Sequence, residues 1–303
     1  MPKTVEQVDR TTRRLWPVLA SPGVIWLILL FLVPAYAVLA IAFSTQINFL
    51  NGQPIPVWNP LEWDFTSFWN MVKESFTGSL QKTWIRTFAY TFIALVLCVL
   101  IGYPVAYYVA RLAGRRRGLL LALLLAPWWI NYITRMLAWI NLLQTDGYVN
   151  DILGFVGLPD TTAWLSGNPV TVVIALVYGY LPFFIIPLYA SLDRIDQRLL
   201  EASRDLGVGS VRTFFHVTLP LSKLGLVTAL VLTALPMAGD YYTNQLVSGS
   251  PTTNMIGNSI EFFLLQGPLK NQGASLVILL SLVLLFFMIY YLMLTQKTAK
   301  ELR

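Results

Sequence analysis

The chain has 303 residues, of which 56% are hydrophobic and only 12% are charged. An ordinary soluble domain carries about 25% Asp, Glu, Lys and Arg, so this sequence lacks much of the charge that a water-exposed surface needs. A single cysteine, Cys98, and a single histidine, His216, exclude an internal disulfide and leave little basis for a histidine metal site or catalytic triad. The composition favours a membrane protein over a soluble enzyme, a disordered chain or a disulfide-rich secreted domain.

Six stretches are long and apolar enough to cross a bilayer, because a hydrocarbon core of about 30 Å needs about 20 mostly apolar residues per helix. They are residues 22–44, 84–110, 118–143, 169–190, 222–247 and 274–295. The apolar run of the first is longer than that of a signal peptide and has no clear A-x-A cleavage site, which favours an uncleaved helix. We therefore expect an all-α membrane protein with a segment 1–21, one transmembrane domain 22–295 and a tail 296–303.

The distribution of Lys and Arg predicts the orientation of these spans. Sixteen of the 21 lie before the first span, in residues 111–117, in residues 191–223 or after residue 295, whereas the alternate connections hold Lys73, Lys82 and Lys270. This asymmetry predicts that both termini are cytoplasmic. It also explains the net charge of +6 as juxtamembrane charge, so we expect no nucleic-acid partner.

The external segments allow two interpretations. Residues 45–82 carry the aromatic residues Trp58, Trp63, Phe65, Phe68 and Trp69 among others, and residues 144–168 contain the turn-rich sequences TDG and GLPD. Both segments are compatible with amphipathic helices at the membrane interface. Both are equally compatible with a docking surface for another protein.

The longest cytoplasmic connection, the loop 191–222, has the pattern of two short helices joined by an elbow. Asp196 is a suitable N-cap for the helical run QRLLEASRDL, and Gly207 is a suitable residue to end it in a left-handed conformation. Ser210 is expected to cap a second short helix that Pro220 stops. His216 is expected to pack within this elbow.

The same loop carries a motif. The sequence reads Glu201-Ala202-Ser203, then Gly207 after three residues, then Val217-Thr218-Leu219-Pro220 after nine. It resembles the E-A-A-x3-G-x9-I-x-L-P signature of the permease subunits of type I ABC importers, with Ser203 in place of the second alanine and Val217 in place of isoleucine. Both replacements keep small or β-branched character.

The resemblance implies that this elbow is a coupling helix, which inserts into a groove of a cytoplasmic ATPase subunit and uses Glu201, Ala202, Ser203, Gly207, Leu219 and Pro220. The chain has no G-x-x-x-x-G-K-[ST] phosphate loop. ATP and Mg would therefore be bound by partner chains, and this chain would be a transport subunit without its own cofactor. The implied partners are a second permease subunit, two ATPase subunits and an external substrate-binding protein, in the inner membrane of a bacterium.

A broader resemblance covers about residues 90–295. The segments IGYPVAYYVA, LLLAPWWINYITRMLAW, TDGYVND, VYGYLPFFIIPLYASLDRID and MIGNSI are similar to the spermidine/putrescine permeases. This similarity implies a polyamine, a cationic small molecule, as the solute.

A polycation path is expected to combine carboxylates with aromatic faces. The candidates are Asp240, Tyr241 and Tyr242 in the fifth span, Trp128 and Arg135 in the third, Tyr178 in the fourth, and Glu261 beyond the fifth. In the third span, Trp128, Asn131, Arg135 and Trp139 are spaced 3, 4 and 4 residues apart, which places them on one helix face. Asp146 and Asp151 would add to an acidic external vestibule.

Other interpretations remain open for these residues and for the protein as a whole. Arg135 would repel a polycation unless neutralised, so Arg135 and Asp240 are also compatible with an intramembrane ion pair. An amino-acid derivative, an organophosphonate, ferric iron or thiamine is an alternative solute. An ion-driven secondary transporter is a different class, disfavoured because the sequence shows neither a repeat nor a midplane ion site.

Overall fold

The computed structural model describes residues 16–17, 19–46, 48, 52, 54–157 and 164–301, and this part of the chain consists of helices joined by turns. Five helices are long and apolar enough to span a membrane, and a bent pair forms a further candidate span. The expected all-α membrane fold is therefore confirmed. Most of the expected segment 1–21 lies outside the described residues.

The helices follow one another along the chain, and several pairs are separated only by short turns. They are the π-turn Ile28–Leu32, α2 (Val33–Ala42), a 3-10 turn Pro60–Glu62, α3 (Thr66–Thr77), α4 (Gln81–Arg111), a 3-10 turn Gly114–Arg116, α5 (Arg117–Leu125), a 3-10 turn Ala126–Trp129, α6 (Tyr132–Leu143), α7 (Tyr148–Phe155), α8 (Pro169–Asp193), α9 (Gln197–Asp205), α10 (Ser210–Thr213), a π-turn Phe214–Thr218, α11 (Leu219–Ala238), α12 (Tyr242–Val247), a 3-10 turn Pro251–Thr253, α13 (Ile256–Leu265), a 3-10 turn Gly267–Leu269 and α14 (Lys270–Glu301).

The described residues fall into two compact units. One comprises those up to Val72 together with those of Phe262–Leu279, and the other comprises those of Lys73–Glu261 and those from Leu280 onward. In the first unit, rings from the external segment gather around Phe43, whose ring centroid lies 4.6 Å from that of Phe65 and 5.1 Å from that of Trp63. Trp63 and Phe65 of the external segment therefore pack against Phe43, and a docking surface for another protein stays a prediction.

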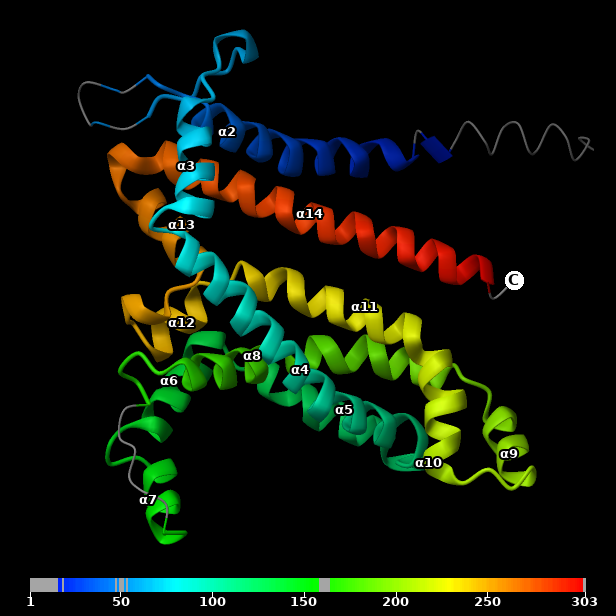
Figure 1. Cartoon of the computed structure of the whole chain (residues 1–303). Helices are drawn as coiled ribbons and strands as arrows, with labels where there is room; N and C mark the ends of the chain where they lie inside the picture. The colour runs from blue at the N-terminus through cyan, green and yellow to red at the C-terminus, as the bar shows by residue number, and fades with distance from the viewer. Residues whose placement is uncertain are drawn as a thin grey trace, which may run out of the picture. The chain divides into compact units, whose positions relative to one another are not determined.

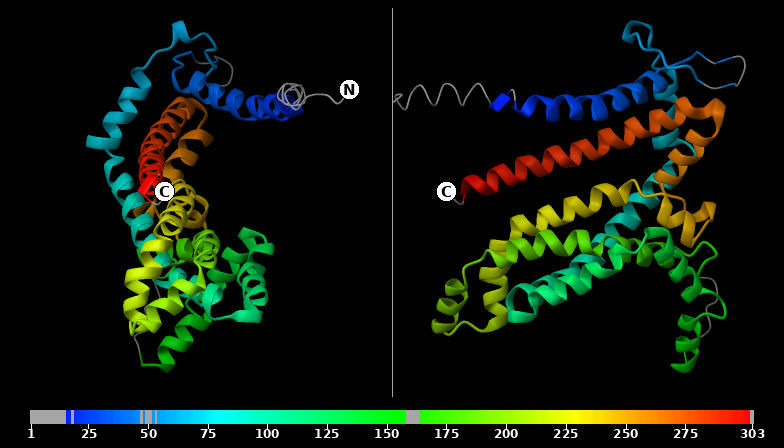
Figure 2. Two further views of the ribbon diagram at one scale, coloured as in Figure 1. Left: turned by 90° about the vertical axis from the view of Figure 1, so that its right-hand side faces the viewer. Right: turned by 180° about the vertical axis from the view of Figure 1, so that it is seen from behind.

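Three spans of the second unit, α4, α8 and α11, lie side by side (Figures 1 and 2). Phe184 and Ile185 of α8 are almost fully buried among them, as is Cys98, which packs as the small apolar residue that the sequence predicts. A Cβ atom at Gly102 of α4 would lie 2.6 Å from the Phe184 ring. Small residues thus allow these helices to approach closely, as is common between helices in membranes.

The third span differs from the single helix expected over residues 118–143. The helical segments Gly114–Trp129 and Tyr132–Phe155 are bent by 89° at a short break. Ile130 is extended (φ −82°, ψ 138°), and the Asn131 side chain caps α6 by accepting a hydrogen bond from the Ile133 N–H (2.9 Å). Trp128 and Arg135 therefore do not share one continuous helix face, and that prediction is wrong.

The fifth span also differs from the prediction, which extended one helix over residues 222–247. The helix ends at Ala238, and a separate short helix, α12, begins at Tyr242. Pro236 stays within the helix, so the proline is not where it stops. Asp240 lies at the break, directly before the N-cap residue Tyr241, and its carboxylate accepts the Thr243 N–H (3.0 Å) in the first turn of the new helix.

Candidate coupling elbow and solute path

The cytoplasmic connection after α8 forms the expected elbow, in which α9 and α10 meet at a tight turn (Figure 1). The Asp196 side chain accepts the Arg198 N–H (3.0 Å) at the start of α9, and Gly207 follows its end with φ +77°. The predicted N-cap and the predicted left-handed glycine are both confirmed. A residue with a Cβ atom adopts this backbone conformation at a cost of about 1–2 kcal/mol, so glycine suits the turn.

The second half of the elbow differs from the expected short helix. Gly209, not Ser210, occupies the N-cap, and Ser210 is the first residue of α10. The helix that begins with α10 continues through the π-helical turn Phe214–Thr218 into α11. Pro220 lies in the first turn of α11, so it does not stop the second helix of the elbow as predicted. Proline fits there because a first-turn residue needs no N–H partner. Leu219 and Pro220 thus belong to the helix of the fifth span, which connects the elbow directly to the membrane.

Ser203 joins the two halves of the elbow. Its hydroxyl lies 2.9 Å from the hydroxyl of Thr213, and both residues are buried. A buried hydroxyl needs such a partner to offset its desolvation. The serine in place of the signature's second alanine is therefore paired with a threonine ten residues later, which holds α9 against α10.

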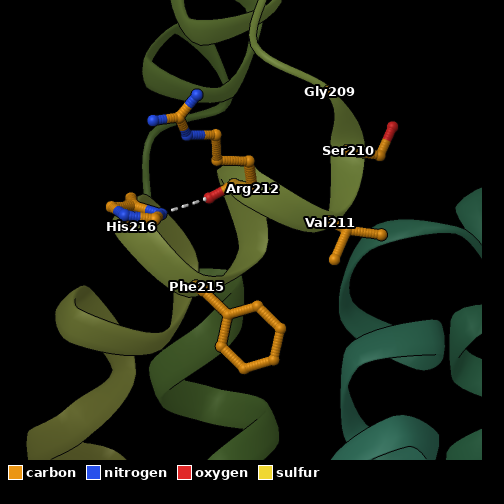
Figure 3. Close-up of a pocket in the computed structure, with 6 residues that line it drawn as sticks. All are labelled: Gly209, Ser210, Val211, Arg212, Phe215 and His216. Atoms are coloured by element: carbon orange, nitrogen blue, oxygen red, sulfur yellow. Dashed lines mark hydrogen bonds between the residues drawn. The ribbon is translucent and has the colours of Figure 1, made fainter.

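The outer surface of the elbow is exposed and partly apolar. Glu201 and Ala202 are exposed on α9, and Leu206 at its end is 83% exposed. Figure 3 shows Val211 and Phe215 beside an open hollow of 590 Å³, both with exposed side chains. His216 is exposed as well, with its ring Nδ1 donating to the carbonyl oxygen of Arg212 (2.9 Å), so it does not pack inside the elbow.

Two polar contacts attach the elbow to α4. The Arg111 guanidinium donates to the carbonyl oxygens of Leu192 and Ile195, the latter at 2.7 Å. Deeper along the same helices, the hydroxyls of Tyr103 and Ser222 lie 2.7 Å apart. A force on the elbow would therefore reach α4 and α8 as well as α11.

Gly207 offers a test of the turn itself. Nothing lies within 4 Å of a Cβ atom built at this position, so a substitution there meets backbone strain rather than a clash. We expect Gly207→Val to distort the turn and lower solute-dependent ATPase activity of the assembled transporter severalfold. Gly207→Asn, which adopts the left-handed conformation more readily, should retain most of that activity. Equal activity of the two variants would contradict this role for the turn.

Within the membrane-spanning part of the second unit, Arg135 occupies a cage of three aromatic rings. Its guanidinium carbon lies 5.3 Å from the ring centroids of Trp128 and Tyr132 and 5.9 Å from that of Tyr178. Arg135 is only 8% exposed, and its Nε and Nη1 atoms have no hydrogen-bond partner among the described residues. The rings attract the cation through their faces, but the guanidinium edge is left unsatisfied.

Asp240 lies in a second polar cluster, which holds a charge of the opposite sign. Its carboxylate accepts hydrogen bonds from the Tyr180 hydroxyl (2.9 Å) and from both the N–H and the hydroxyl of Thr243. Tyr132 donates its own hydroxyl to that of Thr243. Tyr132 therefore joins the two clusters, with its ring face toward Arg135 and its hydroxyl toward the partner of Asp240.

Arg135 and Asp240 do not form the ion pair that the sequence leaves open. The one salt bridge found among the described residues is Arg117–Asp193, at 3.5 Å. Among the described residues classed as buried, Arg135 and Asp240 are the only members of the set Asp, Glu, Lys, Arg and His. Each charge is thus stabilised by neutral groups, Arg135 by ring faces and Asp240 by hydroxyl and N–H donors.

Further aromatic contacts extend from this pair of clusters. The ring of Trp128 lies 4.3 Å from that of Phe183, Trp139 lies 5.3 Å from Tyr178, and Tyr241 lies 5.5 Å from Tyr242. The structure therefore brings together all the predicted path residues except Glu261. Glu261 lies half-exposed on α13 without a hydrogen bond or salt bridge to them in the described part of the chain.

Three members of these clusters, Tyr132, Tyr180 and Thr243, were not among the predicted path residues. Tyr132 follows the Asn131 cap, and the pair Pro127 and Asn131 is the local signal that would have revealed a new helix start there. Tyr180 is two residues from Tyr178 on α8, so the two side chains point to different sides of the helix. This explains why one contacts Arg135 and the other contacts Asp240.

Comparison with known proteins gives a consistent result. Residues 75–300 match the model of a family described as binding-protein-dependent transport system inner membrane component. The spermidine/putrescine transport system permease protein PotB of Escherichia coli is 32% identical over 272 residues, covering 88% of this chain and 92% of that protein. PotB of Haemophilus influenzae is 33% identical over 269 residues, covering 88% and 89%.

Solved structures show the same fold. A chain of a bacterial alginate ABC transporter, in complex with its alginate pentasaccharide-bound periplasmic protein, matches with a TM-score of 0.73 and 17% identity over 96% of this chain and 97% of that one. A chain of the MetNI methionine ABC transporter matches with a TM-score of 0.52 and 20% identity, over 70% and 92%. The chain therefore belongs to the family of binding-protein-dependent transport system inner membrane components, as a multi-pass permease of the bacterial inner membrane.

Proposed function

We propose that this chain forms half of the translocation path of an ATP-driven importer for polyamines such as spermidine and putrescine. The observation that carries the proposal is the similarity to the spermidine/putrescine permeases of two bacteria over 88% of the chain. The second permease subunit, two ATPase subunits that hold ATP and Mg, and an external substrate-binding protein complete the importer.

The chemistry of the interior supports a cationic solute. Asp240 supplies a buried negative charge, and Trp128, Tyr178, Tyr241 and Tyr242 supply ring faces near it or near Arg135. Ring faces and carboxylates attract ammonium groups, whereas the apolar parts of the rings match the methylene chain between them. Glu261 is assigned to the outer entrance, where a carboxylate raises the local concentration of cations.

The shape of the elbow supports coupling to a separate ATPase. Glu201 and Ala202 are exposed on α9, while the buried Ser203–Thr213 pair and Gly207 hold the turn. A rigid elbow transmits a push from closing ATPase subunits into α11, starting at Leu219 and Pro220. The coupling loop is assigned to residues 191–222.

The topology is part of the same proposal. The sixteen Lys and Arg residues of one set of connections support cytoplasmic termini. Residues 1–21 would form a cytoplasmic segment, residues 22–295 one permease domain surrounded by lipid, and residues 296–303 a cytoplasmic tail. A cysteine-accessibility experiment on each side of the membrane would test these assignments.

Uptake of radiolabelled spermidine tests the function. The chain and its partner subunits would be expressed in cells that lack their own polyamine importers. ATP-dependent uptake that excess unlabelled putrescine inhibits is expected. Uptake that persists after ATP depletion but is lost with the ion gradients would instead indicate a secondary transporter.

One observation favours a second candidate within the same family. The unpartnered Nε and Nη1 atoms of Arg135 are buried donors that an anionic solute would satisfy. An organophosphonate or the carboxylate of an amino-acid derivative would fit them. Inhibition of solute binding by such an anion, with no effect of putrescine, would favour this candidate over a polyamine.

A further inference from the structure

The aromatic cage around Arg135 has the composition of a site for an organic ammonium group. Three rings surround one point. Trp128 and Tyr132 come from one segment of the chain, and Tyr178 comes from another. Cages of this kind recognise ammonium ligands because several ring faces surround one cation. In this structure the cation at that point is the chain's own guanidinium.

The guanidinium is held by the rings alone. Two of its three nitrogen atoms, Nε and Nη1, are buried and have no hydrogen-bond partner in the described part of the chain. An unsatisfied buried donor destabilises the buried side chain, whereas the cation–π contacts stabilise it. The two effects oppose each other, so Arg135 is held less firmly than a buried arginine whose donors are all paired.

The surroundings distinguish this guanidinium from a permanent structural cation. A structural arginine in a membrane interior is usually paired with a carboxylate or with backbone carbonyls, as Arg111 is with Leu192 and Ile195. The buried carboxylate of the same unit, Asp240, makes its hydrogen bonds with Tyr180 and Thr243 instead. Asp240 is thus connected to the cage only indirectly, because Thr243 bonds both to Asp240 and to the cage residue Tyr132. It does not pair with the guanidinium in the cage.

We propose that Arg135 is a resident cation that occupies an ammonium site until the transported polyamine displaces it. The proposal rests on the polyamine function and names the site within the path. One ammonium group takes the place of the guanidinium among Trp128, Tyr132 and Tyr178, and Arg135 leaves toward a position where its edge is solvated. The Arg135 side chain thereby competes with the solute for the cage and lowers the affinity of the site. The lower affinity allows the solute to leave the site after it has bound.

Equilibrium binding of radiolabelled spermidine to the purified, assembled importer without its external binding protein tests this idea. Removal of the resident cation in Arg135→Met is expected to tighten binding about three- to tenfold, because a site occupied by a competitor binds with reduced apparent affinity. Arg135→Lys keeps a cation in the cage and is expected to bind within about twofold of the unsubstituted importer. Assembly of all subunits is verified for each variant by size-exclusion chromatography.

A second variant separates the cage from simple charge repulsion. In the double variant Arg135→Met/Tyr178→Leu, one ring of the emptied site is lost, and the tightening should disappear. Tightening that persists in the double variant would overturn the cage, because only the removal of a repelling charge would then be needed. Loss of binding in Arg135→Met with recovery in Arg135→Lys would also overturn the proposal. The cationic side chain at position 135 would then bind the solute directly, by donating to one of its acceptor atoms.

The function and the inference fail in different ways. If the unsubstituted importer, supplied with its external binding protein, fails to take up spermidine, the polyamine function is wrong, and the displaced-cation site is wrong with it. If the unsubstituted importer takes up spermidine but Arg135→Met binds it no more tightly, the function stands and only the inference is overturned.

Discussion

Glu201→Arg should abolish coupled transport while the protein still inserts into the membrane. Glu201 is exposed on α9, and the described residues give it no salt bridge, so the fold loses no internal contact when its charge is reversed. A carboxylate presented on a docking surface meets a basic group of its partner, and reversal places two like charges together at a cost of several kcal/mol. Uptake is therefore expected to fall by at least about tenfold.

The measurements are solute uptake and solute-stimulated ATPase activity in reconstituted vesicles, together with the amount of assembled complex. Glu201→Asp is the matched control, because it keeps the charge at the same position and should retain most of the uptake. Glu201→Ala should give an intermediate loss, since it removes the attraction without adding repulsion. Normal coupled transport in Glu201→Arg would contradict the assignment of α9 as the docking helix.

Much of the fold can be predicted from the sequence because the spans depend on length and apolar composition. The predicted first, second, fourth and sixth spans lie within, or within two residues of, the long helices Leu19–Ala42, Gln81–Arg111, Pro169–Asp193 and Lys270–Met293. The elbow is also predictable, since Asp196 and Gly207 act on neighbouring backbone groups only. These signals are local, and they need no knowledge of other helices.

The two breaks could not be predicted from length and apolar composition. Pro104, Pro182 and Pro187 lie inside helices that continue, so a proline in a span does not by itself mark a break. The bend near Asn131 and the end of α11 coincide with side-chain hydrogen bonds that Asn131 and Asp240 make to the backbone. Hydropathy reveals neither one, because it scores apolar character over a window and not the hydrogen bond that one side chain makes to the backbone.

The candidate path was predicted as a set of residues but not as an arrangement. Sequence spacing placed Trp128 and Arg135 on one helix face, whereas they meet across a bend. Their contact with Tyr178 depends on how α6 lies against α8, and a single sequence does not contain that information. The separation of Arg135 from Asp240 is likewise a result of tertiary packing, which provides each charge with neutral partners instead.

The second large effect is expected at Asp240, where two substitutions separate the charge of the side chain from its structural role. Its carboxylate accepts from the Thr243 N–H in the first turn of α12 and from Tyr180. Asp240→Asn keeps an oxygen that accepts the Thr243 N–H, so the break should persist and the importer should assemble. The negative charge is lost, however, and Asp240 is the only acidic residue among the described residues classed as buried. Spermidine uptake is therefore expected to fall by at least about tenfold, since even a partly screened attraction between charges exceeds about 1.4 kcal/mol at close range.

Asp240→Leu should have a larger and different effect. It removes the acceptor of the Thr243 N–H and hydroxyl and leaves the Tyr180 hydroxyl only its longer contact with the Pro236 carbonyl oxygen (3.4 Å), at a cost of about 1–3 kcal/mol for each buried donor left unsatisfied. Assembly as well as uptake should then decline. Uptake and the amount of assembled complex, measured side by side, distinguish the two roles. If Asp240→Asn assembles and transports normally while Asp240→Leu fails to assemble, the carboxylate holds the break between α11 and α12 and does not attract the solute, because its hydrogen bonds alone would then account for the residue.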